Sequence, residues 1–246
     1  ERRAYRESEF VLINYESVRR LLLAHFGERL NLRRVPYCSE SAFLREDGAA
    51  PPAIPPELAS LEPKDAPLIV SVSRHDPRKG VDGLIRALAR LRTAGVKFRA
   101  CLVGGGGLLE PHRRLAESLG LGSETLITGS VADAYAYLRP ADVFALPSLE
   151  EGSGSVALLE AMQAGIAVVA SDVDGIPEDV TDGDSALLVE PGNISALSRA
   201  IERVLADTAL RHRLAGRARE TFDERFSPDA LTSALQEIYA GLGLTP

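Results

Sequence analysis

The chain has 246 residues, of which 45% are hydrophobic, so it can bury a substantial core as one large domain or as one domain with an appendage. Acidic residues outnumber basic ones by 35 to 28, and the net charge of −7 gives the molecule as a whole no electrostatic reason to bind nucleic acid. The two cysteines, Cys38 and Cys101, belong to no metal-ligand cluster, which favours a reducing, cytoplasmic compartment.

The N-terminal stretch "ERRAYRESEF" lacks the apolar region of a signal peptide, and no apolar run is long enough to span a bilayer. Because the chain opens on Glu1 and not on Met, we expect it to be a piece of a longer protein. Residues 1–34 contain eight arginines and five glutamates, which indicates a solvated helix face or a surface for an anionic partner. The predicted location is the cytoplasm, with peripheral association at the inner face of the membrane as an alternative.

The first part of the chain is expected to hold a strand, an amphipathic helix and a second strand, at residues 10–15, 17–27 and 32–37. The prolines of residues 46–67 argue against a regular element there and indicate a linker or a long surface loop. We place a domain boundary near Asp65, which divides the chain into residues 1–65 and 66–246.

From Leu68 onward, short apolar runs alternate with helical patterns. The predicted strands are residues 68–73, 97–104, 124–129, 142–148, 167–171 and 185–190. The predicted helices between them are 81–93, 108–119, 132–138 and 155–164, with a brief turn at 177–180. Strands that are apolar on both faces and alternate with helices predict a Rossmann-like α/β fold, a parallel sheet covered by helices. Three more helices follow Asn193, the last of them capped by Ser227 and starting at Pro228.

Basic side chains follow the first of these strands, in the stretch "SRHDPRKG". Arg74, Arg78 and Lys79 lie at its carboxyl end, where ligands bind in parallel sheets and where guanidinium and ammonium groups suit a diphosphate. An exposed basic turn is the alternative interpretation. The four histidines have no metal-ligand spacing, and His75 is the one placed where a ligand would bind.

Four glycines, Gly104 to Gly107, follow the second strand. Such a turn lets the backbone approach a ligand and leaves helix-terminal N–H groups for an anion, although a tight crossover also selects glycine. Leu108 and Leu109 break the G-x-G-x-x-G pattern, so a dinucleotide fingerprint is absent. The P-loop pattern is absent as well.

The stretch "LEEGSGSVALLEAMQAG", from Leu149 to Gly165, places three carboxylates around a loop of small residues and a helix start. Backbone N–H groups at that start form an anion site without a side chain. Glu150 and Glu151 would repel an anion, so we assign them sugar hydroxyls, which donate to carboxylates. Glu160 lies beside apolar residues, where a ribose diol would satisfy it. Compensation of the helix dipole by Glu151 and solvent exposure of Glu160 are the alternatives.

Asp172 and Asp174 have the D-x-D spacing that holds a divalent ion in some enzymes. We interpret them as residues of a turn after a strand, where Asp often bonds to the backbone. The sequence therefore predicts no metal site.

Together, "SRHDPRKG", the "GGGG" turn, "ITGSV", the stretch from Ala141 to Asn193 and the amphipathic tail resemble the donor-binding half of retaining GT-B glycosyltransferases of family 4. The resemblance runs from Leu68 to the end, about three quarters of the chain, and the ordered set of motifs is more specific than any one of them. It implies that residues 66–246 form the C-terminal half of a GT-B fold. Residues 1–65 look like the end of the acceptor domain and the interdomain linker.

The resemblance also implies roles at matching positions. Arg74 and Lys79, at the family's R-x4-K spacing, hold the donor diphosphate, and Glu160 binds the ribose hydroxyls. Glu151 contacts the donor sugar on the face where the acceptor attacks. Eight residues separate Glu151 from Glu160, where the family usually has seven, so the Gly-Ser loop must absorb one more. The other implied donor-binding positions are Gly105, Gly106, Thr128, Ser130, Val131, Gly154, Ser155 and Val156.

The implied activity is transfer of a sugar from a UDP-, GDP- or ADP-linked donor to an acceptor hydroxyl with retention of configuration, without a metal or another cofactor. Almost none of the family's acceptor domain is present, so we expect this chain to bind the donor and to transfer little alone. A non-catalytic binding or interaction module and a nucleotide-sugar epimerase are the alternative functions.

Overall fold

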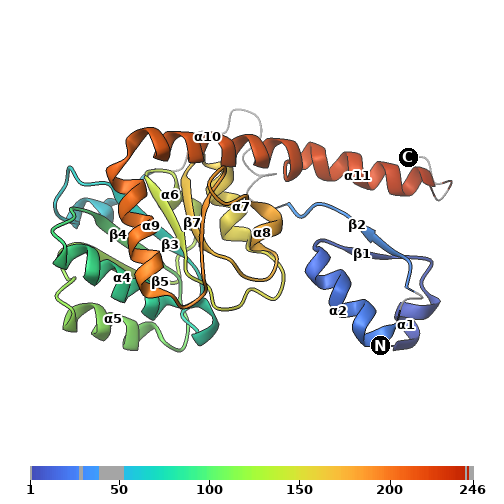
Figure 1. The fold of residues 1–246 in the computed structure, drawn as a ribbon, viewed down its shortest axis with the longest axis horizontal. Helices are drawn as coiled ribbons and strands as arrows, with labels where there is room; N and C mark the ends of the chain where they lie inside the picture. Colours follow the sequence, from blue (N-terminus) through green and yellow to red (C-terminus); the bar gives the residue numbers. More distant parts are fainter. Residues whose placement is uncertain (1, 28–29, 39–52, 242, 244–246) are drawn as a thin grey trace.

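The computed structural model describes residues 2–27, 30–38, 53–241 and 243, and its centre is a parallel sheet (Figure 1). Six strands lie in the order β5-β4-β3-β6-β7-β8. They are β3 (Leu68–Val72), β4 (Arg99–Val103), β5 (Thr125–Gly129), β6 (Val143–Leu146), β7 (Ala167–Ser171) and β8 (Leu187–Val189). All neighbouring pairs are parallel, which confirms the predicted Rossmann-like α/β fold.

Helices connect the strands and cover both faces of the sheet. One face is covered by α4 (Val81–Thr93), α5 (Leu109–Ser118) and α9 (Ile194–Ala206). The other face is covered by α6 (Tyr135–Leu138), α7 (Val156–Gln163) and α8 (Ile176–Asp179). The helix α10 (Thr208–Arg225) contributes side chains to both cores, and α11 (Pro228–Gly241) follows it. The predicted bounds of α4 are confirmed, as is the N-cap of α11, where Ser227 Oγ accepts from the amide of Ala230 at 3.2 Å.

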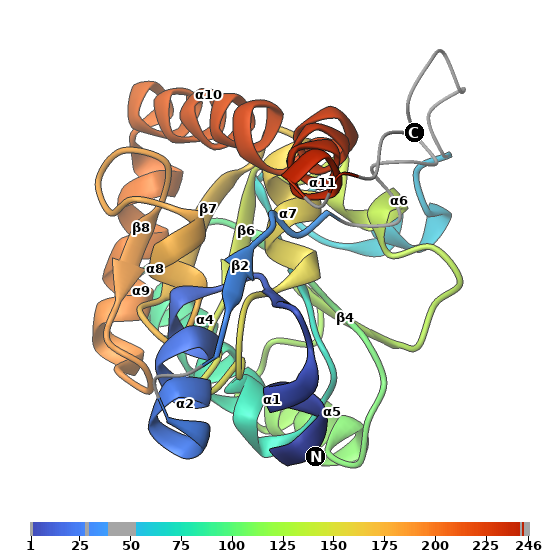
Figure 2. The same ribbon diagram turned by 90° about the vertical axis from the view of Figure 1, so that its right-hand side faces the viewer.

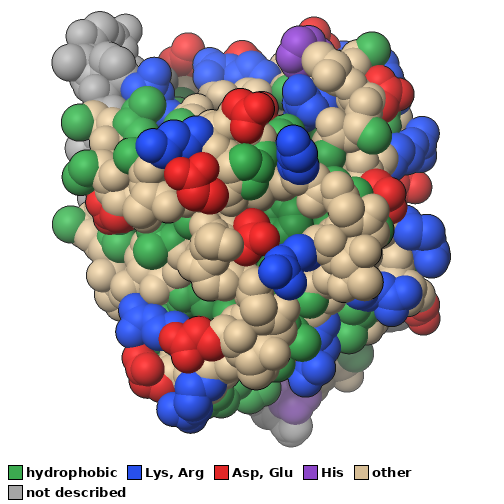
Figure 3. Space-filling view, turned by 90° about the vertical axis from the view of Figure 1, so that its left-hand side faces the viewer, with side chains coloured by type: hydrophobic (Ala, Val, Ile, Leu, Met, Phe, Trp, Pro, Cys, Tyr) green, Lys and Arg blue, Asp and Glu red, His purple; other side chains and the backbone are tan. Residues whose placement is uncertain are grey.

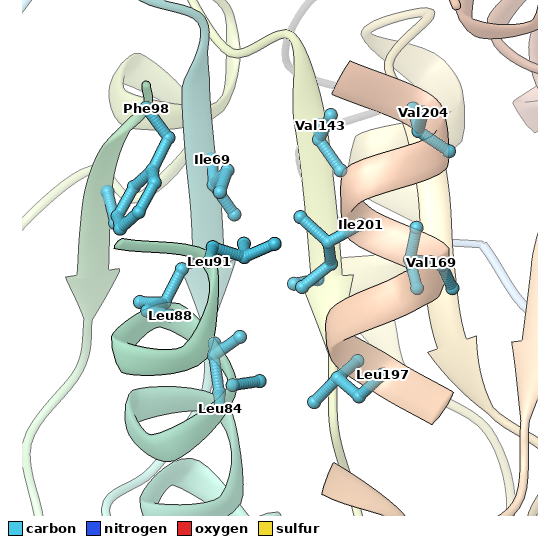
Figure 4. Close-up of a cluster of buried hydrophobic side chains, with 14 of the residues drawn as sticks. Ile69, Leu84, Leu88, Leu91, Phe98, Val143, Val169, Leu197, Ile201 and Val204 are labelled. Atoms are coloured by element: carbon cyan, nitrogen blue, oxygen red, sulfur yellow. The ribbon is translucent and has the colours of Figure 1, made fainter. Parts of the chain in front are cut away.

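The sheet separates two hydrophobic cores because successive side chains of a strand point to opposite faces. In β6, Phe144 belongs to the core under α6, α7 and α8, called the first core below, while its neighbours Val143 and Ala145 belong to the core under α4, α5 and α9, called the second core. Figure 4 shows the second core, in which Leu84, Leu88 and Leu91 of α4 and Leu197, Ile201 and Val204 of α9 face the sheet. Burial on both faces explains why these strands have apolar sequences without alternation.

The order of the strands has a switch point between β3 and β6. From β3 the chain proceeds outward through β4 and β5, and it then returns to the other side of β3 to begin β6. The connections that leave these two adjacent strands run in opposite directions, which opens a crevice at the carboxyl edge of the sheet. The loops after β3 and β6 therefore meet at the place where a ligand is expected.

The first segment forms a separate small layer beside the sheet. It contains α1 (Arg2–Glu7), β1 (Val11–Ile13), α2 (Glu16–Phe26) and β2 (Leu32–Arg34), with β1 and β2 parallel. In Figure 1, α11 runs above β1 and β2, and Figure 2 shows the same segment in front of the sheet. The strand-helix-strand order was predicted, whereas α1 was not.

The linker is described only from residue 53, and its residues 46–52 lie outside the described residues. The prediction that prolines exclude a regular element was wrong for η1 (Pro56–Ser60), a short 3-10 helix. Pro56 occupies the first position of this helix, where the missing N–H has no role. Leu58 and Leu61 anchor the linker in the first core. The division of the chain near Asp65 stays a prediction.

The surface over α4, α5 and α9 carries both charges in mixture. Figure 3 shows Lys and Arg side chains interspersed with Asp and Glu, with hydrophobic groups between them. Such mixing is typical of a solvated surface. Among the helices of the described residues, none combines the length and the hydropathy needed to cross a membrane.

Leu88 is fully buried between α4 and the sheet, so Leu88→Ala is expected to lower the free energy of unfolding by about 2–5 kcal/mol through lost burial and a residual cavity. Leu21→Ala is a matched control, because Leu21 is a helical leucine that is 66% exposed. Urea unfolding followed by circular dichroism measures both changes. Equal losses in the two variants would contradict this account of the core.

Candidate functional site

The carboxyl ends of the strands bring the predicted site residues to one edge of the sheet. The loops there are residues 73–80 after β3, 104–108 after β4, 130–134 after β5, 147–155 after β6 and 172–175 after β7. Arg74 is exposed at this edge, and Glu160 is half-buried one turn inside α7. The motifs singled out from the sequence therefore occupy a common region.

An ion pair crosses the switch point. The ammonium group of Lys79 lies 2.6 Å from Oε2 of Glu151, and the two side chains are 18% and 4% exposed. The hydroxyl of Ser148 donates to the other carboxylate oxygen, Oε1. Both oxygens of Glu151 are thus engaged, and Lys79 is held at the crevice by a charge that a phosphate oxygen could replace. Ser148 was not singled out from the sequence.

Backbone contacts fix these two loops against each other. The carbonyl oxygen of Arg78 accepts from the amides of Leu149 at 2.6 Å and Glu150 at 3.0 Å. Gly80 has φ +60°, and a Cβ there would lie 2.2 Å from the carbonyl oxygen of Pro147. A side chain at this position would push the loops apart, and with them the two partners of the ion pair.

Asp174 clamps the loop that carries Glu151. Its Oδ2 accepts from the amides of Glu151 at 2.6 Å and Gly152 at 2.7 Å, and its own φ is +51°. A left-handed conformation costs a non-glycine residue energy, which these two hydrogen bonds offset. The interpretation of Asp174 as a backbone-bonding residue is confirmed, although its partners lie in another loop. Among the described residues, no three His, Cys, Asp or Glu side chains are grouped to hold a metal ion.

The N-terminus of α7 opens at the same edge. Ser155 is its N-cap, and the hydroxyl accepts from the amide of Leu158 at 3.4 Å. The amides of Val156 and Ala157 have no acceptor within the helix, because the first turn of a helix offers none. This arrangement fits the predicted anion site from Gly154 to Val156.

The glycines after β4 pack tightly against the loop after β3. Gly104 has φ +139°, and a Cβ there would lie 1.9 Å from the carbonyl oxygen of Ser73. At Gly106, with φ +148°, the distance to the carbonyl oxygen of His75 would be 2.5 Å. A Cβ at Gly105 would lie 2.3 Å from Oγ of Ser130. Contacts with the neighbouring loops are therefore enough to require glycine at these positions, without any ligand. The donor-binding roles of Gly105 and Gly106 stay predictions.

The predicted donor-binding residues at the end of β5 and just after it differ in their surroundings. Thr128 is half-buried and donates its hydroxyl to the carbonyl oxygen of Gly129 at 2.7 Å. Ser130 is exposed, and Val131 packs against the first core. Ser130 is therefore the most accessible of these three predicted donor-binding positions.

His75 does not face a ligand, which corrects the expectation from the sequence. Its side chain is 1% exposed, and its Nδ1 lies 2.9 Å from Nδ1 of His112 in α5. This bond needs one protonated and one unprotonated Nδ1, so at least the accepting imidazole is neutral. The pair joins the basic loop to the helix that follows the glycine-rich turn. Sequence spacing gave no sign of it, since the two residues lie 37 positions apart.

Protonation of this histidine pair is unfavourable. Burial lowers the pKa of His75 to about 4, and the neighbouring His112 and Arg113 act in the same direction. Burial also lowers the pKa of His112, against the opposing effect of the Asp82 carboxylate. The loop that carries Arg74 is therefore held by a contact between two histidines whose charged forms are disfavoured by burial.

Comparison with known proteins identifies the family. Residues 58–221 match the family described as "Glycosyl transferases group 1". The match covers more than half of the chain, and the chain belongs to this family.

Individual relatives are similar over part of their length. The lipopolysaccharide core biosynthesis glycosyltransferase LpsE of Rhizobium meliloti is 36% identical over 178 residues, which cover 72% of this chain and 51% of that protein. The GDP-mannose-dependent alpha-(1-6)-phosphatidylinositol monomannoside mannosyltransferase of Mycolicibacterium smegmatis is 37% identical over 151 residues, which cover 58% and 40%. The chain spans about half the length of the curated relatives it matches.

A solved structure shares the fold over nearly the whole chain. It is HepE from Anabaena in complex with UDP-glucose, with a TM-score of 0.78 at 23% identity. The likeness covers 98% of this chain and 65% of that chain. The chain therefore shares its α/β architecture with part of that structure.

The histidine pair predicts a pH dependence of stability. Between pH 6.5 and 4 the unfolded chain binds protons at His75 and His112 that the folded chain does not, so stability is lost as the pH falls. We expect this pair to lower the free energy of unfolding by on the order of 2 kcal/mol between pH 7 and 5, since one pKa unit corresponds to about 1.4 kcal/mol. The Asp179 carboxyl, whose pKa burial raises to about 7, acts in the opposite direction over this range, so the contribution of the pair is the difference between the wild type and a variant that lacks it. Urea unfolding at the two pH values measures it.

Two variants isolate the source of this drop. The double variant His75→Leu/His112→Leu should lack this contribution, because it carries neither imidazole, so its free energy of unfolding at pH 5 relative to pH 7 should exceed that of the wild type. His212→Gln should behave like the wild type, because His212 is exposed on α10. The same pH dependence in the wild type and in the double variant would contradict the assignment to this pair.

Proposed function

We propose that the chain is the donor-binding part of a retaining glycosyltransferase of family 4, which binds a nucleotide diphosphate sugar at the carboxyl edge of the sheet. The observation that carries the proposal is the Lys79–Glu151 pair at the switch point, next to the N-terminus of α7. A cation, a carboxylate and helix-terminal amides meet there. These are the groups needed for a substrate that combines phosphates with sugar hydroxyls.

The diphosphate is the leaving group of the reaction, and its growing charge must be stabilised. Lys79, the exposed Arg74 and the amides at the start of α7 supply this stabilisation. An ammonium, a guanidinium and a helix N-terminus act electrostatically without a resident metal. The prediction that no cofactor is required belongs to this proposal.

Donor binding rearranges the ion pair. A phosphate oxygen that reaches Lys79 replaces one oxygen of Glu151, which remains held through its other oxygen by Ser148. The released oxygen then accepts from a hydroxyl of the donor sugar. Because the loop is clamped by Asp174, the carboxylate stays in place while its partner changes. Glu151 thus pairs with Lys79 in the absence of the donor and accepts from a sugar hydroxyl in its presence.

The names of a relative and of a fold neighbour narrow the choice of nucleotides to test. The name of the mycobacterial relative specifies GDP-mannose, and the fold neighbour contains UDP-glucose, so GDP and UDP are the first nucleotides to test, with ADP third. The acceptor domain precedes this half, with residues 1–65 as its end and residues 66–246 as the donor domain. Alone, the chain binds donor and transfers little. Peripheral membrane association stays a prediction.

Lys79→Ala should weaken nucleotide diphosphate binding by about 10- to 100-fold, the effect of losing a charge-assisted hydrogen bond of 1.5–3 kcal/mol. Calorimetric titration of the chain with GDP, UDP and ADP measures the affinity. Lys97→Ala is the matched control, since Lys97 is an exposed lysine before β4. Unchanged affinity in Lys79→Ala, or no binding of any of the three to the wild type, would count against the proposed function.

Glu160→Ala tests the ribose contact. The variant should bind the preferred nucleoside diphosphate about tenfold more weakly, because a carboxylate that accepts from ribose hydroxyls is lost. The 2′,3′-dideoxy form of the same nucleotide has no such hydroxyls, so the wild type and the variant should bind it equally. An equal loss for both ligands would show that Glu160 acts on the fold instead.

A further inference from the structure

Tyr15 belongs to the first segment, yet its side chain is inserted beside the donor site. The residue precedes α2 and is 3% exposed. A Cβ on Gly154 would lie 1.8 Å from its hydroxyl oxygen, and a Cβ on Gly175 would lie 2.6 Å from its Cδ1. The ring thus fills the space between the loop before α7 and the turn after β7. Gly154 requires glycine because the ring is there, whereas at Gly175 a Cβ would lie closer still, at 2.3 Å, to the carbonyl oxygen of Ser153.

The hydroxyl of Tyr15 is anchored at the far side of this turn. It donates to Oδ2 of Asp179 at 3.0 Å, and the Asp179 side chain is fully buried. Within the described residues, Oδ1 of Asp179 has no hydrogen-bond partner. The bond from Tyr15 is therefore the main compensation for burying this carboxyl group, so the ring has a strong reason to stay in place.

A second contact fixes the backbone on which Tyr15 lies. The carboxylate of Glu178 accepts from the amides of Glu16 at 2.8 Å and Ser17 at 2.9 Å, which open the first turn of α2. The guanidinium of Arg34 lies 3.1 Å from the same carboxylate. An anion at a helix N-terminus is favourable, and two consecutive acidic residues of α8 thus hold the first segment.

The two loops that Tyr15 contacts are also bonded to each other. The amide of Gly175 donates to the carbonyl oxygen of Ser153 at 2.6 Å, next to the clamp formed by Asp174. Gly154 follows directly, and the amides that open α7 come after it. A shift of the tyrosine ring would therefore be transmitted to the backbone groups assigned to the donor phosphate.

We propose that Tyr15 is a positioning residue of the donor site, which holds the loop at Gly154 and makes its geometry depend on the placement of the first segment. This inference rests on the proposed function, because it assigns the amides after Gly154 to a phosphate. Its consequence is a coupling: moving the first segment away from α8 withdraws the ring and weakens donor binding. By linkage, a bound donor stabilises the docked segment to the same extent.

The first test is hydrogen exchange of the amides from Gly152 to Ala157, which needs no ligand. Tyr15→Ala should speed this exchange about tenfold, because the loop loses its support. Tyr15→Phe keeps the ring and should restore most of the protection. Tyr239→Ala, at an exposed tyrosine of α11, is the control and should leave the loop unchanged. Wild-type exchange rates in Tyr15→Ala would overturn the proposal.

The second test is a double-mutant cycle on binding of the preferred nucleoside diphosphate. Gly154→Ala alone should weaken binding, because the new Cβ collides with Tyr15. In the Tyr15→Ala background the same change should cost much less, since the space is now open. Additive losses, or full affinity in Tyr15→Ala, would overturn the positioning role. If the wild type binds none of the three nucleotides, the proposed function fails, and the exchange experiment still decides whether Tyr15 holds the loop.

Discussion

The reversal of strand order between β3 and β6 is the constraint on which the rest of the structure depends. Because the crossovers leave these adjacent strands toward opposite sides, neither covers the carboxyl edge between them. The polar groups of the loops that begin there must find partners in the neighbouring loop. They do so through the carbonyl of Arg78 and through the ion pair of Lys79 and Glu151. The site is a consequence of topology first and of side-chain chemistry second.

Close backbone packing then determines where glycine must occur. Gly80, Gly104 and Gly106 all have positive φ, and each lies where a Cβ would meet a carbonyl oxygen of a neighbouring loop. A glycine-rich turn in the sequence can therefore report the approach of protein backbone as well as the approach of a ligand. The same reasoning explains Gly154, whose neighbour is the ring of Tyr15, and Gly175, whose neighbours are the carbonyl oxygen of Ser153 and that ring. In these loops, glycine occurs where parts of the chain that are distant in sequence pack closely against each other.

The sequence predicted the sheet because burial on both faces leaves a local signal, the continuous apolar runs of β3 to β8. It also predicted which loops meet, since parallel strands end at one edge. It did not predict the contacts that arise only from folding, such as Tyr15 with Asp179 over 164 positions or His75 with His112 over 37. A single histidine or tyrosine has no local sequence pattern that identifies its partner. Asp174 left a partial signal, a polar residue before a glycine in a turn.

The ion pair at the switch point is not explained by stability alone. Removing Lys79 and Glu151 from water costs a desolvation free energy that a pair of apolar side chains of similar volume would avoid. Many buried ion pairs are for this reason no more stabilising than a hydrophobic replacement. Under the proposed function, Lys79 exchanges Glu151 for a phosphate, and the incoming phosphate must offer Lys79 at least the interaction energy that Glu151 gives it. A lysine held in this way is kept in position without being committed to one partner, and this is the property that a reusable phosphate site requires.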